Sequence, residues 1–249
     1  MAWSDPIDAY CERLGPGLLG EPANALSNFA FLAAAVALWR LQSSLRARGH
    51  EPPRDIRLLP SLVFLVAVGS TLFHTLAVRW TGLLDTLLIL LYCCAFLYSF
   101  LRHAVCTPAW VALAVAGAFA GISFALPRLF PPGALNGSTA YIPNLIGLLA
   151  VTAWLAWHHA PAARGFGLGS VVFCISLTLR TVDQEICARF PLGTHFAWHL
   201  LTGLLLWIVS REMLLGHYAT HAESASSRGP RNAGVSRAAP NDKGRPAPR

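Results

Sequence analysis

Apolar residues fall in blocks of about 20 along this chain of 249 residues, and a helix of about 20 residues crosses the ~30 Å hydrocarbon core of a membrane. Charged residues make up 12% of the chain, against roughly 25% in a typical soluble domain. Hydrophobic residues reach 55%. These features exclude a soluble globular protein and predict an all-α integral, multi-pass membrane protein.

Seven apolar stretches, separated by Pro, Gly, Arg or polar clusters, are candidate membrane spans. We therefore expect a bundle of seven transmembrane helices within residues 24–214. An acidic segment, residues 1–23, precedes the bundle, and because it lacks the basic start of a signal peptide we expect the first span to remain in the mature protein. The expected spans are residues 24–44, 58–78, 81–101, 107–126, 140–158, 167–187 and 194–214.

The orientation follows from Lys and Arg, which are enriched in cytoplasmic loops. If the N-terminus is outside, eight arginines of the loops and helix ends fall on the cytoplasmic side and four on the other side. The sequence therefore predicts an outer N-terminus and a cytoplasmic C-terminus. The use of 18 Arg against a single Lys is typical of a GC-rich genome, so we expect the inner membrane of a bacterium.

The last segment, residues 215–249, is rich in Ser, Ala, Pro, Gly and Arg, and such a composition buries too little surface to fold. We expect a disordered basic cytoplasmic tail. It supplies +4 of the formal net charge of +7, so the basic character of the chain describes a topology signal with weak attraction to anionic lipids. Nucleic acid is not an expected partner, and the oligomeric state is not decided by the sequence.

Five polar side chains lie inside the expected spans, where a charged group costs roughly 2.5–3.5 kcal/mol and is usually paired or functional. Ser70 and His74 are one helical turn apart, and Asp85 begins the next span after a very short link. His195 and His199 have the same spacing at the start of the last span. In the expected topology all five lie at one depth, in the outer half of the membrane.

Three imidazoles with a free fourth position are the ligand set of a catalytic zinc ion. We therefore expect His74, His195 and His199 to bind zinc, Asp85 to act as a general base, and Ser70 to hydrogen-bond water or a developing oxyanion. The alternative for each histidine taken alone is a hydrogen bond to a neighbouring helix. The shared depth of the five residues favours the joint interpretation.

Other polar residues receive structural interpretations. Arg180 and Asp183 are three residues apart in one span, which predicts a salt bridge within the helix. His217 and His221 repeat the spacing of the last-span pair, but they follow that span and are not expected to bind the metal. Tyr141 and Asn144 start the fifth span and are expected to line the pocket.

The residues that carry this chemistry resemble the alkaline ceramidase family over residues 8–210. That resemblance implies a seven-helix bundle that binds zinc through three histidines and hydrolyses the amide of ceramide to a sphingoid base and a fatty acid. The wider superfamily contains receptors, so two alternatives stay open: a lipid-binding receptor or sensor with structural zinc, and a hydrolase of another lipid class. The matching motifs are Tyr10-Cys11-Glu12, Glu21-x2-Asn24-x2-Ser27-Asn28, Gly69-Ser70-x3-His74, Leu84-Asp85, Asp183-x3-Cys187 and His195-x3-His199.

The resemblance also implies a calcium site in the front segment, at Asp8, Tyr10, Glu12 and Glu21. Asp8 stands one residue earlier than the family pattern requires, since Ala9 directly precedes Tyr10. Acidic side chains without basic partners suit a hard cation, and an outer location of the segment explains the same acids without a metal.

Two cysteines, Cys11 before the first span and Cys187 at the end of the sixth, fall on the outer side in this topology. Because an oxidising compartment permits disulfide formation, we expect a bond that ties the acidic segment near the zinc site.

Overall fold

Proline, glycine and polar clusters divide the chain into helices. The computed structural model describes residues 2–13, 15, 17 and 19–218, and within these residues it contains eight α-helices, two 3-10 helices and no strand beyond an isolated bridge between Pro6 and Val78. The elements are α1 (Pro22–Ser27), α2 (Phe29–Ala47), α3 (Arg54–Leu76), α4 (Arg79–His103), α5 (Ala109–Ala125), η1 (Leu126–Leu129), η2 (Ala134–Tyr141), α6 (Ile142–Trp157), α7 (Ala163–Ile186) and α8 (His195–Leu214).

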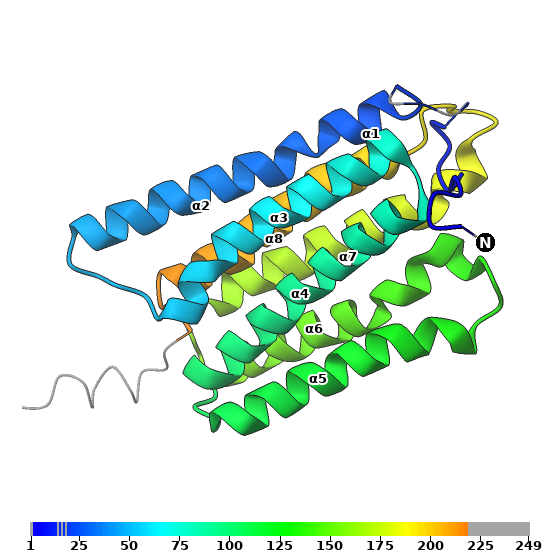
Figure 1. Ribbon diagram of the computed structural model, residues 1–249. Coiled ribbons are helices and arrows are strands. Elements are labelled where there is room, and N and C mark those ends of the chain that lie inside the picture. The colour runs from blue at the N-terminus through cyan, green and yellow to red at the C-terminus, as the bar shows by residue number, and fades with distance from the viewer. Residues whose placement is uncertain (1, 14, 16, 18, 219–249) are drawn as a thin grey trace, which may run out of the picture.

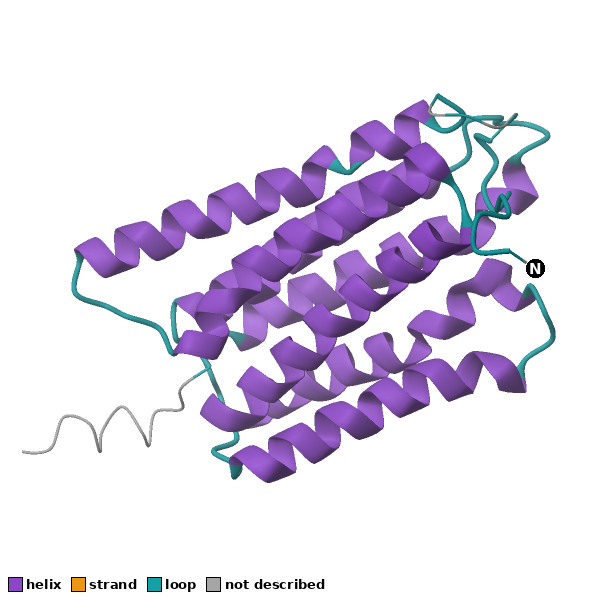
Figure 2. Ribbon diagram, in the orientation of Figure 1, coloured by secondary structure: helices purple, strands orange, loops and turns teal. Residues whose placement is uncertain are grey.

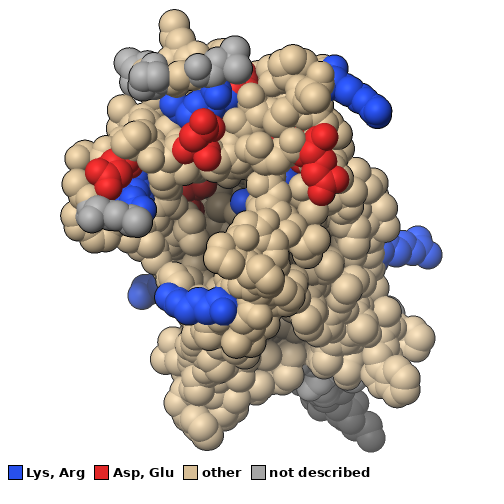
Figure 3. All heavy atoms as spheres, turned by 90° about the vertical axis from the view of Figure 1, so that its right-hand side faces the viewer, with Lys and Arg blue, Asp and Glu red and all other residues tan. Residues whose placement is uncertain are grey.

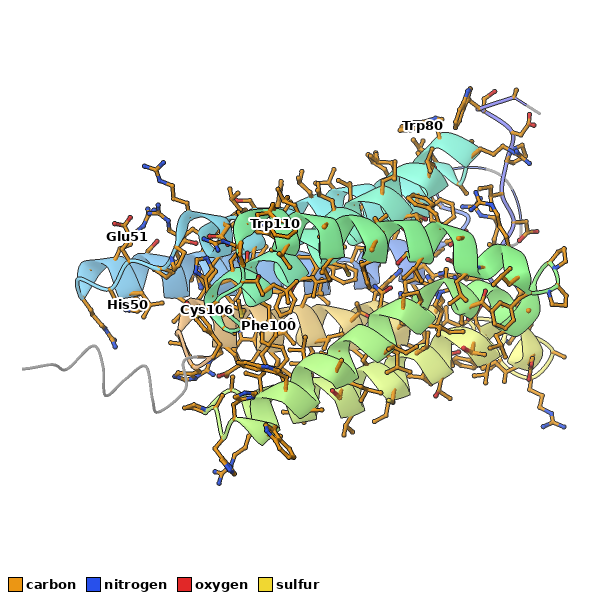
Figure 4. All side chains as sticks on the ribbon, turned by 90° about the horizontal axis from the view of Figure 1, so that it is seen from below. His50, Glu51, Trp80, Phe100, Cys106 and Trp110 are labelled. Atoms are coloured by element: carbon orange, nitrogen blue, oxygen red, sulfur yellow. A yellow bond between two sulfur atoms is a disulfide. The ribbon has the colours of Figure 1, made fainter. Side chains whose placement is uncertain are left out.

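The long helices lie side by side, and successive helices run in opposite directions (Figures 1 and 2). The N-terminal segment, the link between α3 and α4 and the loop between α7 and α8 gather at one end of the bundle, which we call the site end. Trp80 lies at this end, whereas His50, Glu51 and Cys106 lie at the opposite end (Figure 4). The described chain therefore begins and ends at opposite ends of the bundle.

Six stretches of helix are long and apolar enough to cross a membrane. They are Pro22–Ala47, Arg54–Leu76, Arg79–His103, Ala109–Leu129, Ala134–Trp157 and Ala163–Ile186. Their bounds agree with the first six expected spans to within a few residues. The all-helical multi-pass membrane class is thus confirmed with six candidate spans.

Helix α8 covers the seventh expected stretch and packs against α7, α2 and α3. It is not among the six membrane-spanning candidates, although it has 20 residues. Its approach to α2 is close, since a Cβ atom at Gly203 would lie 2.9 Å from the Cβ atom of Ala30. Because α8 is flanked by three helices, polar residues on it can be buried at the centre of the bundle.

The expected disordered tail falls mostly on residues 219–249, which lie outside the described residues. Exposed apolar side chains cover the long helices on their outward faces, as a lipid environment requires. Examples are Leu91, Trp110, Leu113, Ile146 and Leu168.

Candidate metal and catalytic site

Three histidines meet at the site end of the bundle. His74 lies in the last turn of α3, and His195 and His199 lie one turn apart at the start of α8. One ring nitrogen from each can be chosen so that all three lie within 4.8 Å of one another, and all three side chains are buried. The structure thus brings together the three predicted residues in a group that could hold a metal ion.

Two of these rings donate hydrogen bonds through Nδ1, which leaves Nε2 available for a metal ion. His74 Nδ1 lies 2.5 Å from Glu21 Oε2, and His199 Nδ1 lies 3.1 Å from the carbonyl oxygen of Asn24 and 2.6 Å from Ser27 Oγ. Since carboxylate and carbonyl oxygens only accept hydrogen bonds, each Nδ1 carries a hydrogen, and in the neutral imidazole each Nε2 then has a lone pair for a metal ion.

Two other ring nitrogens of the histidine group have no hydrogen-bond partner among the described residues. His74 Nε2 and His195 Nδ1 are buried and make no hydrogen bond. A buried polar atom without a partner costs free energy, and protein metal sites typically orient histidine through its other ring nitrogen in this way. The residues present therefore fit a metal ion held by three imidazoles.

Ser70 and Asp85 lie beside the histidines because α3 and α4 approach closely. A Cβ atom at Gly69 would lie 2.6 Å from Leu88 Cδ1 and 3.5 Å from the Asp85 Cα atom, so a larger residue there would require the Leu88 side chain to shift. Both side chains line the same cavity as His195 and His199. Asp85 Oδ1 is buried and has no hydrogen-bond partner.

A cavity extends from these residues into the bundle. It encloses about 1070 Å³ of empty space, counting its open mouth. Its wall on α8 runs from His195 to Val209, which at 1.5 Å per residue is about 21 Å. Tyr141 and Asn144 line it as predicted, and the wall between the polar site and the far end is formed mainly by apolar side chains, including Phe31, Val66, Ile89, Phe96, Leu148 and Leu205.

The N-terminal segment covers the metal group. Tyr10 stacks on His195 with ring centroids 3.7 Å apart and an interplanar angle of 20°, and its ring lies 5.2 Å from that of His74. Burial raises the pKa of Tyr10 above its usual range, so its hydroxyl stays protonated. In the view toward the site end, charged side chains surround a hollow in the surface (Figure 3).

A disulfide confirms the expected link between the segment and the bundle. Cys11 and Cys187 are bonded with their Cα atoms 5.3 Å apart, within the usual range for disulfides. The backbone N–H of Cys11 also donates to Asp183 Oδ2 at 3.1 Å. The segment is therefore held covalently and by hydrogen bonding beside the first turn of α8.

Asp183 organises the start of α8. Its Oδ1 accepts hydrogen bonds from the backbone N–H groups of Thr194 at 2.6 Å and His195 at 2.9 Å. A carboxylate at a helix N-terminus is stabilised by the unpaired N–H groups and the helix dipole. Gly193 makes the contact possible, since it has φ +68° and a Cβ atom there would lie 2.2 Å from Asp183 Oδ1.

The predicted salt bridge between Arg180 and Asp183 is wrong. Arg180 instead donates to the carbonyl oxygen of Asn136 at 2.7 Å and to Ser138 Oγ at 2.9 Å, and its guanidinium lies over the ring of Tyr141. The helical spacing permitted the pair, but each charged group has closer partners from other parts of the chain.

The residues expected to bind calcium do not converge on an open position. Asp8 is exposed. Glu12 accepts hydrogen bonds from the backbone N–H groups of Ala23 at 2.5 Å and Asn24 at 2.8 Å, which caps the start of α1. Among the described residues, the three histidines form the only cluster of metal-ligating side chains.

Glu21 is engaged on both carboxylate oxygens. Oε1 accepts from Arg13 Nε at 2.5 Å, and Oε2 accepts from His74 Nδ1 at 2.5 Å and from Asn24 Nδ2 at 3.1 Å. Burial alone would raise the pKa of Glu21, but the hydrogen bonds that it accepts from His74, Arg13 and Asn24 outweigh this effect, so this pKa lies below its usual value. Glu21 therefore stays ionised as a partner of His74.

The roles of Arg13 and Asp183 were not recognised from the sequence. One signal was present for Arg13, a basic residue within an otherwise acidic N-terminal segment. His217, as expected, is remote from the metal group and contacts Glu212 at the opposite end of the bundle, while His221 lies outside the described residues.

Comparisons with known proteins identify the family. No curated protein matches the chain. The sequence model of the Ceramidase family matches residues 17–229, which include every residue of the histidine group together with Ser70 and Asp85. A match over most of the chain implies a ceramide-hydrolysing activity on a lipid substrate within the membrane, and it shows that the chain belongs to the Ceramidase family.

Proposed function

We propose that the chain is a zinc-dependent intramembrane hydrolase that cleaves the amide bond of ceramide-like lipids to a sphingoid base and a fatty acid. One observation carries this proposal: three buried imidazoles with free ring nitrogens lie beside a carboxylate that has one unpartnered oxygen, at the polar end of a long apolar cavity. Family membership supports the choice of an amide as the bond that is cleaved.

The donor set supports zinc as the metal of His74, His195 and His199. Three neutral imidazoles with a free position for substrate or water are the usual ligands of catalytic zinc, whereas calcium and magnesium prefer oxygen ligands. When bound, zinc would polarise a carbonyl group and make water acidic enough to ionise near neutral pH.

The residues of the chain account for the proton transfers of amide hydrolysis. Asp85, whose Oδ1 has no other partner, accepts a proton from the attacking water as the new C–O bond forms. It then delivers that proton to the nitrogen of the leaving amine as the C–N bond breaks. The Ser70 hydroxyl donates a hydrogen bond to the oxyanion that develops on the carbonyl oxygen.

The cavity supports a lipid with a long hydrocarbon chain. Its apolar wall of about 21 Å along α8 leads away from the polar site. One chain of the lipid would lie along this wall, and the amide would rest between Asp85 and the histidines.

We further propose that α8 is a seventh membrane span and that the site end faces the outer side of a bacterial inner membrane. In this arrangement residues 1–23 lie outside, residues 24–214 form the bundle and residues 215–249 lie on the cytoplasmic side. The bond between Cys11 and Cys187 supports the outer location of the site end, because disulfides form in oxidising compartments. The greater number of arginines toward the opposite end supports the same orientation.

The test is to assay the purified full-length protein with ceramide and to measure its metal content. We expect stoichiometric zinc and release of a fatty acid and a sphingoid base, both lost on chelation and restored by zinc. Incubation with a membrane lipid extract, followed by lipid analysis, separates the alternatives. Consumption of another lipid class would replace the substrate, and zinc-loaded protein that binds lipid without cleaving it would favour a receptor.

A further inference from the structure

Arg13 places a cation inside the contact between the N-terminal segment and the metal group. Its side chain is only 6% exposed, and that of Glu21 is 2% exposed. The guanidinium donates to Glu21 Oε1 at 2.5 Å, to the carbonyl oxygen of Gly15 at 3.2 Å and to the carbonyl oxygen of His74 at 3.5 Å. A carboxylate and two backbone carbonyls thus surround one buried positive charge.

Gly20 provides the space for this guanidinium. A Cβ atom at Gly20 would lie 2.9 Å from Arg13 Nη1 and 2.7 Å from the carbonyl oxygen of Gly15. With any other residue at this position, the guanidinium or the backbone at Gly15 would have to shift. The local chain is therefore shaped around the side chain of Arg13.

The oxygen atoms that the family resemblance assigns to calcium are already engaged by this arrangement. The carbonyl oxygen of Tyr10 accepts a hydrogen bond from the backbone N–H of Arg13 at 3.2 Å, and both oxygens of Glu12 cap α1. Calcium requires six to eight oxygen ligands, and a guanidinium beside Glu21 would repel a second cation. These residues do not fit a calcium ion.

We propose that the Arg13 guanidinium serves as the fixed internal cation that joins the N-terminal segment to the metal group, so that this chain holds Glu21 on His74 without calcium. The charge, the acceptors and the burial are those of a bound ion, but the cation is covalently part of the chain. The part of this proposal that concerns His74 rests on the proposed zinc site, whereas the independence from calcium does not.

The first experiment measures thermal unfolding of the purified protein in detergent, with millimolar calcium and with a calcium chelator. We expect the same melting temperature in both conditions. A rise with calcium that Glu21→Gln abolishes would overturn the proposal. A rise that persists in Glu21→Gln would report calcium bound elsewhere and leaves the proposal supported.

The second experiment varies the charge of Arg13. Arg13→Gln removes the charge, and we expect a lower melting temperature and a 10- to 100-fold loss of affinity for zinc, since partners that orient metal ligands have effects of about this size. Arg13→Lys keeps the charge without the planar fork, so it should recover part of both losses. The matched control is Arg128→Gln, because Arg128 is an exposed arginine whose guanidinium donates to the carbonyl oxygen of Phe124, four residues earlier in the chain.

The outcomes separate this proposal from the proposed function. An Arg13→Gln variant that matches the wild type in both melting temperature and zinc affinity would overturn the role of Arg13. If the wild type itself bound no zinc, the proposed function would fail, and the calcium comparison would still decide whether Arg13 is the cation at this position.

Discussion

The carboxylate of Asp183 gives the most specific test of how the site is held together. It accepts three backbone N–H groups, those of Thr194 and His195 on Oδ1 and that of Cys11 on Oδ2. Asp183→Asn keeps the shape of the side chain but removes its charge, and with Oδ1 retained as the amide oxygen it turns an NH₂ group toward the N–H of Cys11. The substitution therefore weakens two hydrogen bonds and abolishes the third.

The expected loss follows from the strengths of these bonds. A hydrogen bond to a charged group contributes about 1.5–3 kcal/mol and a neutral one about 0.5–1.5 kcal/mol. Two bonds weakened by about 1 kcal/mol each and one lost at about 2 kcal/mol lower the free energy of unfolding by about 4 kcal/mol. Because the backbone of His195 is one of the donors, we also expect the affinity for zinc to fall about 10- to 100-fold.

The assay is reversible unfolding in mixed detergent micelles, together with a chelator competition for the bound metal. Glu185→Gln is the matched control, since Glu185 is an exposed acid two residues further along the same helix. If Asp183→Asn is as stable as this control, the hydrogen-bond argument is refuted. If it is less stable but binds zinc with the wild-type affinity, Asp183 supports the fold without positioning His195.

Four further predictions concern the reaction and the segment that covers it. Asp85→Asn should lower turnover about 10²- to 10⁴-fold, as expected for loss of a general base, while elemental analysis finds wild-type zinc; zinc loss would instead identify Asp85 as a ligand. His199→Ala should lose both zinc and turnover, and retained metal would contradict the three-histidine site. Gly193→Ala should lower the melting temperature, because its Cβ atom would overlap Asp183 Oδ1 at a φ of +68°, and an unchanged value would refute this packing argument. Cys11→Ser should make the N-terminal segment more sensitive to protease while the bundle stays intact, and equal cleavage rates would show that the disulfide is not needed to hold the segment.

The helices and the histidine group could be predicted because each has a strong local signal. Apolar blocks of membrane length fix the first six candidate spans to within a few residues, and the HxxxH spacing of His195 and His199 places both rings on one helix face. The short link between α3 and α4 made Asp85 a neighbour of His74. These inferences needed only helix geometry and the thickness of a membrane.

The contacts of the N-terminal segment could not be predicted in the same way. Residues 2–21 show no helical periodicity, so their spacing did not indicate that the Arg13 side chain would contact Glu21 and the backbone of His74. The error for Arg180 and Asp183 has a related cause. Neighbours on one helix are visible in the sequence, but the loop at Asn136 and the start of α8, which provide the actual partners, are brought there by tertiary folding.

The bond between Cys11 and Cys187 has a consequence for biosynthesis. Its two cysteines are 176 positions apart in the sequence, and α8, which supplies two of the three imidazoles, begins eight residues after Cys187. Cys11 can therefore form this bond only after most of the bundle has been synthesised. The histidine group cannot be complete before that stage either, because His195 and His199 both follow Cys187 in the chain.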